Sequence, residues 1–261
     1  MSADWLYRDI PVLGQRVHRV GLVGNFGIDP GTFEAALERG LNYVFWTPKM
    51  TKVTPVLKAA LKKNRSSIVL ATGPTFSFFG GSLRSGTEKV LRMLDIDYID
   101  ILQQFWLGKT SAQTGATTEA LAELKESGKV RLIGTSIHDR ARAGQLAADR
   151  AYDMLMVRYN AAHPGAEKDI FPHVDPMQTM VVSYTATRWR KLLKRPRGWD
   201  GPIATAADCY RFSLSRAEVD LSLMGVKNQA QLIENLEGLE KGPMTGTEMS
   251  WMRAFGRAVH G

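Results

Sequence analysis

The sequence has little cysteine and no long apolar run. Its 261 residues include one cysteine, Cys209, which excludes an internal disulfide, a cysteine-rich zinc site and a paired-thiol redox motif. We expect Cys209 to be a small buried residue in a reducing compartment. No apolar stretch approaches the length of a membrane span, so we expect no membrane partner. The start, Met1 to Trp5, lacks the basic-then-apolar order of a signal peptide, and we expect a cytoplasmic protein.

The composition is that of an ordinary folded protein with a positive net charge. Hydrophobic residues make up 44% and charged residues 23%, which excludes a disordered or collagen-like chain. Lysine and arginine number 34 against 26 aspartates and glutamates, and the formal net charge is +8. Such a charge suits phosphates, acidic metabolites or nucleic acid without choosing among them. We expect a small-molecule ligand rather than nucleic acid, and the composition leaves the oligomeric state open.

Short aliphatic runs alternate with longer amphipathic stretches along the whole chain, as in βα units around a parallel sheet. Eight strands in this length, with no Pro/Gly/Ser-rich linker, predict an α/β fold in which residues 1–261 form a single (β/α)8 TIM barrel domain. The predicted strands are Val20 to Val23, Tyr43 to Trp46, Ile68 to Thr72, Tyr98 to Gln103, Val130 to Gly134, Met154 to Val157, Met180 to Tyr184 and Asp220 to Met224.

An open doubly wound sheet is the alternative architecture. It would normally show a GxGxxG phosphate-binding turn after the first strand, followed by an acidic residue after the second. Here Gly21, Gly24 and Gly27 are spaced GxxGxxG. We therefore interpret these glycines as serving a tight turn and close packing, and we favour the barrel.

Seven segments, in order along the chain, resemble those of aldo-keto reductases. The resemblance implies an N-terminal β-hairpin ahead of the barrel, and it covers nearly the whole sequence. The segments are Tyr7 to Leu22, Ala36 to Tyr43, Leu91 to Gln103 with Asp97 to Asp100, Leu124 to Ser136 with Gly128 to Arg131, Arg158 to Asn160, Val181 to Tyr184, and Gln231 to Asn235.

The resemblance fails at the residues that carry the family's chemistry. In the family a tyrosine donates a proton to the substrate carbonyl, a lysine paired with an aspartate lowers the pKa of that tyrosine, and a histidine orients the carbonyl, while the nicotinamide delivers hydride. All four are replaced here, so ordinary carbonyl reduction is not expected. Phe45 or Trp46 stands for the aspartate, Lys49 or Met50 for the tyrosine, Gly73 for the lysine, and Phe105, followed by Trp106, for the histidine.

The cofactor residues of the family are better matched. The resemblance implies that Ser136 and Asn160 hydrogen-bond the nicotinamide amide, and that the ring stacks on Tyr184. Lys227 could meet a 2′-phosphate, which favours NADP over NAD, although Gln231 stands where many relatives have arginine. These residues could instead be ordinary polar residues retained after loss of the cofactor. The residues expected at the adenosine end, after the eighth strand, are Gly225, Lys227, Asn228, Gln231, Glu234 and Asn235.

Three side chains are candidates for a different chemistry. His138 could act as a general base with Asp139 orienting it, although Asp139 could equally cap the helix that follows. His163 lies on the next loop and could face the same pocket. Lys49 could act as a base or form an imine in apolar surroundings, or could simply be exposed. We expect no metal, because no third ligand accompanies the two histidines.

Two further clusters follow the strands. Phe45, Trp46, Phe105 and Trp106 could line an apolar substrate pocket or pack in the core. The basic run from Arg188 to Arg197 could neutralise a cofactor pyrophosphate, contact nucleic acid, or form a solvated amphipathic helix with Leu192 and Leu193 inward. We favour the helix.

Three functions remain open from the sequence. The first is an atypical aldo-keto-reductase-like protein that binds NADP(H) or a similar phosphate-bearing ligand without using the family tetrad. The second is a cofactor-independent lyase or isomerase in the aromatic pocket. The third is a non-catalytic barrel that binds a ligand or partner, since the barrel architecture supports many chemistries.

Overall fold

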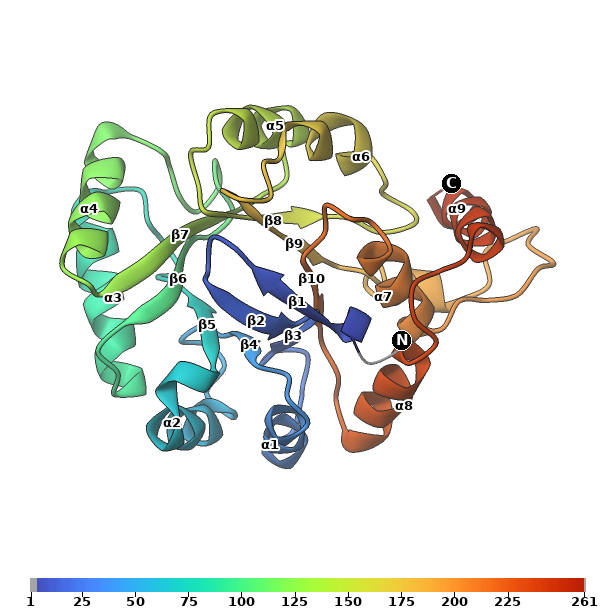
Figure 1. Cartoon of the computed structure of the whole chain (residues 1–261), viewed down its shortest axis with the longest axis horizontal. Coiled ribbons are helices and arrows are strands. Elements are labelled where there is room, and N and C mark those ends of the chain that lie inside the picture. Colours follow the sequence, from blue (N-terminus) through green and yellow to red (C-terminus); the bar gives the residue numbers. More distant parts are fainter. Residues whose placement is uncertain (1–3, 261) are drawn as a thin grey trace.

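The structure, a computed structural model, describes residues 4–260 and contains a closed barrel of eight parallel strands (Figure 1). The strands are paired in the order β10-β3-β4-β5-β6-β7-β8-β9, which confirms the predicted (β/α)8 fold. Their bounds are β3 Val20–Val23, β4 Tyr43–Phe45, β5 Val69–Thr72, β6 Ile99–Gln104, β7 Val130–Ile137, β8 Met154–Arg158, β9 Met180–Tyr184 and β10 Leu221–Met224.

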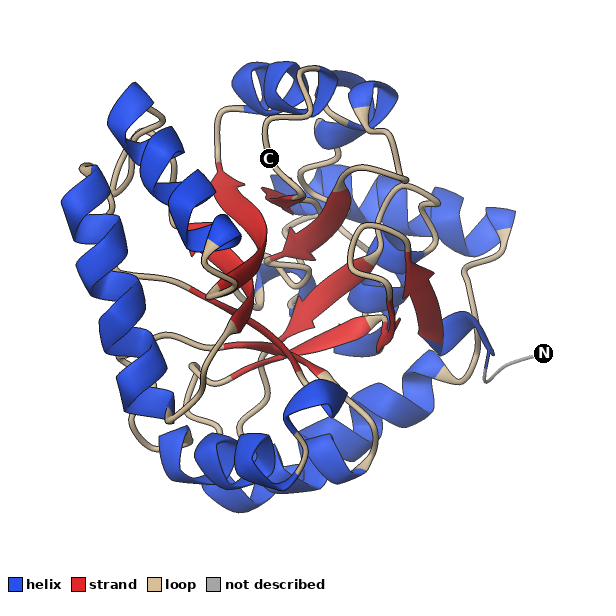
Figure 2. Ribbon diagram, turned by 60° about the vertical axis from the view of Figure 1, so that its left-hand side comes forward, coloured by secondary structure: helices blue, strands red, loops and turns tan. Residues whose placement is uncertain are grey.

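Helices surround the strands (Figure 2). Five of them begin at a side chain that accepts a hydrogen bond from the first turn: Asp29, Thr114, Asp139, Thr205 and Asn228. Four short 3₁₀ segments accompany them, namely Asp4–Leu6, Arg65–Ser67, Phe171–His173 and Lys191–Leu193. The helices are α1 Pro30–Glu38, α2 Thr54–Lys63, α3 Gly80–Leu94, α4 Gly115–Glu126, α5 Arg140–Ala148, α6 Ala166–Asp169, α7 Ala206–Leu214, α8 Gln229–Leu239 and α9 Gly246–His260.

An antiparallel hairpin precedes the barrel, as the resemblance implies. Its strands, β1 (Tyr7–Ile10) and β2 (Gln15–His18), pair from Tyr7 with His18 to Ile10 with Gln15. The connection from β2 to β3 is the single residue Arg19, so the hairpin lies at the end of the barrel where β3 begins. The opposite end, where all eight strands finish, is therefore left to the βα loops, and ligand sites of such barrels lie there.

Close packing explains the first glycine of the GxxGxxG run. A Cβ at Gly21 would lie 2.8 Å from the Tyr43 ring and 3.0 Å from both Leu221 and Leu223. Gly27 has a φ of +85°, which favours glycine in the turn before α1. Cys209 is buried, as expected. Within residues 4–260, none of the helices combines the length and the apolar character needed to span a membrane.

Two local predictions are wrong. The basic run after β9 is not an amphipathic helix, because Arg188, Trp189 and Arg190 all have left-handed backbone angles that interrupt helical hydrogen bonding. Only Lys191–Leu193 forms a short 3₁₀ turn, with Leu192 buried and Leu193 half-buried. The sequence pattern predicts that the fifth barrel strand ends at Gly134, with Ser136 in the loop after it. Strand β7 instead extends to Ile137, so Ser136 lies within the strand as its second-last residue.

Candidate functional site

Two phenylalanines lie at the carboxyl ends of strands β4 and β6. Phe45 is the last residue of β4 and Phe105 follows β6, and both are half-buried. Their ring centroids are 5.6 Å apart at an interplanar angle of 68°, the edge-to-face arrangement of a stable aromatic pair. This part of the barrel mouth can bind apolar groups and offers no proton donor from these positions.

Gly73, directly after β5, lies between those two strands and has no room for a side chain. A Cβ at this position would lie 2.2 Å from the carbonyl oxygen of Gln103 on β6 and 3.1 Å from its carbonyl carbon. Both obstructing atoms belong to the backbone of the neighbouring strand, so no rotamer change relieves the clash. The segment after β5 has therefore packed against β6 in a way that a lysine at position 73 would prevent.

Two of the predicted pocket residues lie elsewhere. Trp46 has no exposed surface, and its indole N–H donates to the Thr54 hydroxyl at the start of α2 (3.1 Å). The prediction that Trp46 lines a substrate pocket is wrong, because the side chain packs between the barrel and α2. Lys49 is exposed in the turn that follows, whereas an amine activated as a base or nucleophile needs apolar surroundings. Its predicted place in an aromatic pocket is therefore also wrong.

His138, which follows β7, contacts two aromatic side chains at the barrel mouth. Its ring packs edge-on against Trp106 and Tyr184, with centroids 5.5 and 5.7 Å away. The Tyr184 hydroxyl lies 3.1 Å from Nδ1 and 3.2 Å from Nε2 of the imidazole. The structure thus places His138, a predicted catalytic residue, in contact with Tyr184, on which the cofactor ring is predicted to stack.

The ionisation states of this pair follow from burial and from one neighbouring cation. Partial burial and the charge of Arg158 lower the pKa of His138. Burial raises the pKa of Tyr184 to about 12, and Arg158 opposes that rise. At neutral pH the imidazole is therefore neutral and the phenol protonated, so the pair can share or relay one proton. Asp139 does not orient His138, because its carboxylate accepts from Arg142 N (3.0 Å) as the cap of α5.

The two predicted partners of the nicotinamide amide are engaged inside the protein. Asn160 is fully buried, and its amide donates to the Thr185 carbonyl oxygen (2.9 Å). Its side-chain oxygen accepts from Ala162 N (3.1 Å) and lies 3.2 Å from His163 Nδ1. Asn160 thus braces two loops, and its contact with a ligand stays a prediction. The Ser136 hydroxyl accepts from Trp106 N (2.7 Å) and retains only its own proton to donate.

Cationic and polar groups gather at the start of α8, after β10. Asn228 caps the helix by accepting from Gln231 N (3.1 Å), and Gln231 Oε1 in turn accepts from Lys227 N (3.0 Å). Lys227 and Glu234 are exposed, and Lys227 forms no ion pair with any residue between 4 and 260. Asn235 is buried, with its amide 3.5 Å from the Met224 sulfur, so it supports the helix from within.

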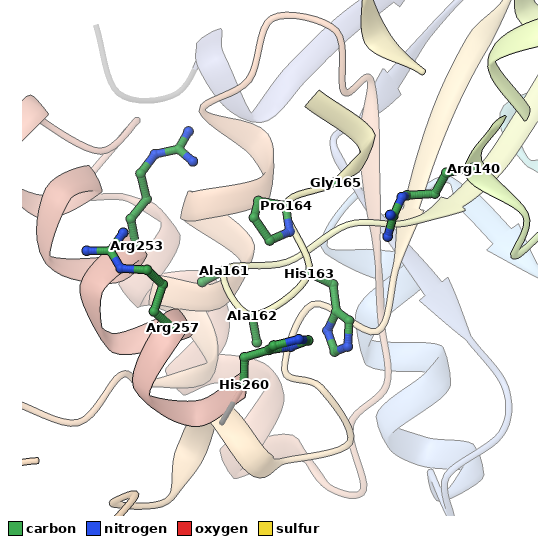
Figure 3. A pocket seen from close by; sticks show the side chains of 9 residues that line it. All are labelled: Arg140, Ala161, Ala162, His163, Pro164, Gly165, Arg253, Arg257 and His260. Atoms are coloured by element: carbon green, nitrogen blue, oxygen red, sulfur yellow. The ribbon is translucent and has the colours of Figure 1, made fainter. Parts of the chain in front are cut away.

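His163 lies in a different cleft from His138. It packs edge-on against His260 of α9 with ring centroids 5.1 Å apart, and both line a cavity that does not include His138 (Figure 3). Burial and the charges of Arg158 and Arg188 lower the pKa of His163 to about 4. The prediction that the two histidines share a pocket is wrong. Within the described range 4–260, no three potential ligands are grouped as a metal site requires.

Sequence reasoning missed several groups at this end of the barrel. The run Phe76, Phe78 and Phe79 after β5 is exposed, as is Phe26 after β3. Such exposed rings on strand-end loops are typical of binding surfaces, and a Phe-Ser-Phe-Phe run directly after a predicted strand was the signal. Arg257 and His260 were missed because they belong to α9, which was not predicted.

The sequence model of the aldo/keto reductase family matches residues 34–188, more than half of the chain. The chain belongs to this family. A comparison with curated proteins finds no match. The family assignment agrees with the barrel, with the hairpin ahead of it and with the order of the segments noted in the sequence.

Solved structures of aldo-keto reductases share the fold over nearly the full length. The enzyme from Bacillus halodurans in its holo form has 20% identity and a TM-score of 0.78, with 95% of each chain covered. One from Klebsiella pneumoniae, in complex with NADP and acetate, has 18% identity and a TM-score of 0.76, with 94% of this chain and 93% of that one covered. The thermostable Tm1743, bound to the inhibitor epalrestat, has 18% identity and a TM-score of 0.74, with coverage of 96% and 99%.

Proposed function

We propose that this family member binds NADP(H) and does not reduce carbonyl compounds by the family tetrad. The observation that carries the proposal is the packing of Gly73 against the Gln103 backbone, next to the Phe45 and Phe105 pair. By the resemblance, these three positions would hold the lysine, the aspartate and the histidine. A closed backbone and two aromatic rings supply neither charge nor a proton, so carbonyl polarisation by the family route is absent.

The phosphate end of the proposed cofactor site fits the residues present. Lys227 is exposed at the start of α8, next to backbone N–H groups of the first helical turn that have no acceptor within the helix. A phosphate there would gain a charge-assisted hydrogen bond and the favourable end of the helix dipole. The Klebsiella pneumoniae relative in complex with NADP supports this choice of cofactor.

The nicotinamide end fits less completely. Tyr184 offers a half-buried ring for stacking, and Ser136 offers one hydroxyl proton, but Asn160 is fully buried and its amide already donates to the Thr185 carbonyl oxygen. When bound, the nicotinamide would supply hydride. The Tyr184 hydroxyl would stay within hydrogen-bond distance of His138, and this pair would not take the place of the tyrosine that the family uses.

Lys227→Ala should weaken NADPH binding about tenfold and NADH binding less than twofold, since one charge-assisted hydrogen bond to the 2′-phosphate is lost. The measurement is an equilibrium titration of each nucleotide that follows quenching of tryptophan fluorescence. Lys62→Ala, an exposed lysine of α2, is the matched control and should leave both affinities unchanged. Equal weakening of NADPH and NADH by Lys227→Ala, or no saturable NADPH binding by the unmodified protein, would refute the cofactor assignment.

The contact between His138 and Tyr184 favours a second candidate function, proton transfer without nicotinamide. A neutral imidazole beside aromatic rings can remove a proton next to a carbonyl, as a lyase or isomerase requires. The assay follows the exchange of α-protons of carbonyl compounds into deuterated water by NMR, with no nucleotide added. His138→Ala should lower any such exchange by about 100-fold, the usual contribution of a general base. Exchange that survives in His138→Ala would exclude this residue from the reaction.

A further inference from the structure

A second cleft lies beside the barrel mouth, between the loop after β8 and the C-terminal helix α9. Its volume is about 520 Å³, within the range of small-ligand sites. The walls are formed by the loop 161–165, the start of α5 and the last two turns of α9 (Figure 3). None of the residues assigned above to the nicotinamide or to the start of α8 lines it. The cleft is therefore separate from the proposed cofactor site.

The titratable side chains that line this cleft are all basic. Arg140 comes from α5, His163 from the loop, and Arg253, Arg257 and His260 from α9. Arg140 pairs with Asp169 (2.7 Å) and Arg253 with Glu167 (2.8 Å), so these two charges are balanced at the edge of the cleft. Arg257 forms no ion pair with residues 4–260, and no carboxylate lines the cavity. The cleft holds an excess of positive charge.

Close packing at two glycines holds the walls in place. A Cβ at Gly165 would lie 2.7 Å from the Arg140 guanidinium carbon, so the glycine lets the guanidinium rest against the loop. A Cβ at Gly256 would lie 2.1 Å from the Ala161 carbonyl oxygen, so α9 approaches the loop as closely as its backbone allows. The Arg188 guanidinium donates to the Val259 carbonyl oxygen and ties the end of α9 to the loop after β9.

We propose that this cleft binds the phosphoryl group of a small anionic metabolite, independently of the nicotinamide cofactor. Guanidinium groups present paired N–H donors that match phosphate oxygens, and two imidazoles can add donors when protonated. The excess of arginine opposes a metal cation at the two histidines. A cavity of this size, bounded on both sides by packed backbone, admits a sugar phosphate and excludes a nucleic-acid duplex.

The first test is calorimetric titration of inorganic pyrophosphate into the whole protein. Arg257→Gln should weaken binding about tenfold, since it removes the one lining arginine without a carboxylate partner. Arg92→Gln, an exposed arginine of α3 with the same loss of charge, should change the affinity less than twofold. Gly165→Ala is a second variant, which keeps every charge and should also weaken binding because it displaces Arg140.

The uptake of protons by His163 on binding provides a second measurement, independent of the variants. His163 has a pKa of about 4 in the free protein because burial and the charges of Arg158, Arg188, His260 and Arg140 oppose its charged form. The neighbouring acceptor is Asn160, whose side-chain oxygen lies 3.2 Å from His163 Nδ1. A bound anion favours the imidazolium, so binding of sulfate, whose charge is constant in this range, should take up protons and tighten as the pH falls from about 7 to 5. Titrations in buffers of different ionisation enthalpy measure this uptake.

The outcomes are decisive in both directions. Tighter binding of ribose 5-phosphate than of inorganic phosphate assigns the site to a metabolite, and equal binding assigns it to the free ion; both support a phosphoryl site. Equal weakening by Arg257→Gln and Arg92→Gln would show diffuse charge attraction and overturn the proposal. Displacement of pyrophosphate by NADPH would also overturn it, because the cleft would then belong to the cofactor. Failure of NADPH to bind would sink the proposed function and leave this site untouched.

Discussion

Gly73→Lys, which introduces the residue that the sequence resemblance implies for the family at this position, is expected to destabilise the protein by about 3 to 4 kcal/mol and to restore no carbonyl reduction. The size follows from overpacking against backbone, where neighbouring side chains cannot move aside. The new Cβ would lie 2.2 Å from the Gln103 carbonyl oxygen, and β5 would have to separate from β6 to accommodate it. Chemical denaturation of the purified variant measures the loss.

A matched control separates this steric effect from the cost of a new lysine. Gly115 begins α4, and a Cβ there would have no heavy atom within 4 Å. Gly115→Lys should therefore change the free energy of unfolding by less than about 0.5 kcal/mol, as is usual at exposed positions. Equal stability of the two lysine variants would mean that the backbone after β5 leaves room for the family lysine, and the structural basis of the proposed function would be lost.

Asp100→Asn is expected to destabilise the protein by about 3 to 5 kcal/mol, the range found when one partner of a buried ion pair is removed. Asp100 lies on β6 with 1% of its surface exposed. Its carboxylate accepts from Arg65 (2.7 Å), from Arg131 on β7 (2.8 Å) and from Leu70 N on β5 (2.9 Å). An uncharged amide would leave two guanidinium groups without their counter-charge, and three neighbouring elements would lose their common tie.

The control for Asp100→Asn is the same change at an exposed pair. Asp9 accepts from Arg16 at 2.8 Å with 76% of its side chain exposed, and Asp9→Asn should cost less than about 1 kcal/mol. Thermal and denaturant unfolding of both variants give the comparison. If Asp100→Asn were as mild as Asp9→Asn, the hydrogen bonds and ion pairs of this carboxylate would not be what holds β5, β6 and β7 together. The presence of a buried aspartate at position 100 would then need another explanation.

The fold could be predicted from the sequence because the same pattern, a short buried strand and then an amphipathic helix, recurs along the chain. Several barrel strands, such as Val20–Val23 and Val69–Thr72, are short runs buried along their whole length, and amphipathic stretches alternate with them along the chain. Eight repeats at this spacing restrict the architecture even when the ends of single elements are misplaced by a residue or two. The N-terminal hairpin came from the resemblance, and the pairing of Tyr7 with His18 agrees with it.

The candidate site could be predicted only in part, because side-chain direction and loop geometry are long-range properties. Trp46 follows Phe45 by one residue, yet one side chain faces α2 and the other the barrel mouth. Asn160 matches a ligand-binding position, yet three internal partners engage it. Helix α9, which carries Arg257 and His260, lies after the last βα unit, where the barrel repeat no longer predicts an element.

The most direct test of the account is to mix the purified protein with NADPH and an excess of a panel of aldehydes and ketones, following tryptophan fluorescence and nicotinamide absorbance together. The account predicts saturable quenching of the fluorescence with no loss of reduced nicotinamide, because Phe45, Gly73 and Phe105 supply no proton or charge to a carbonyl. Oxidation of NADPH in proportion to the added carbonyl compound would contradict it, and would show that the barrel mouth performs the family reaction by other residues.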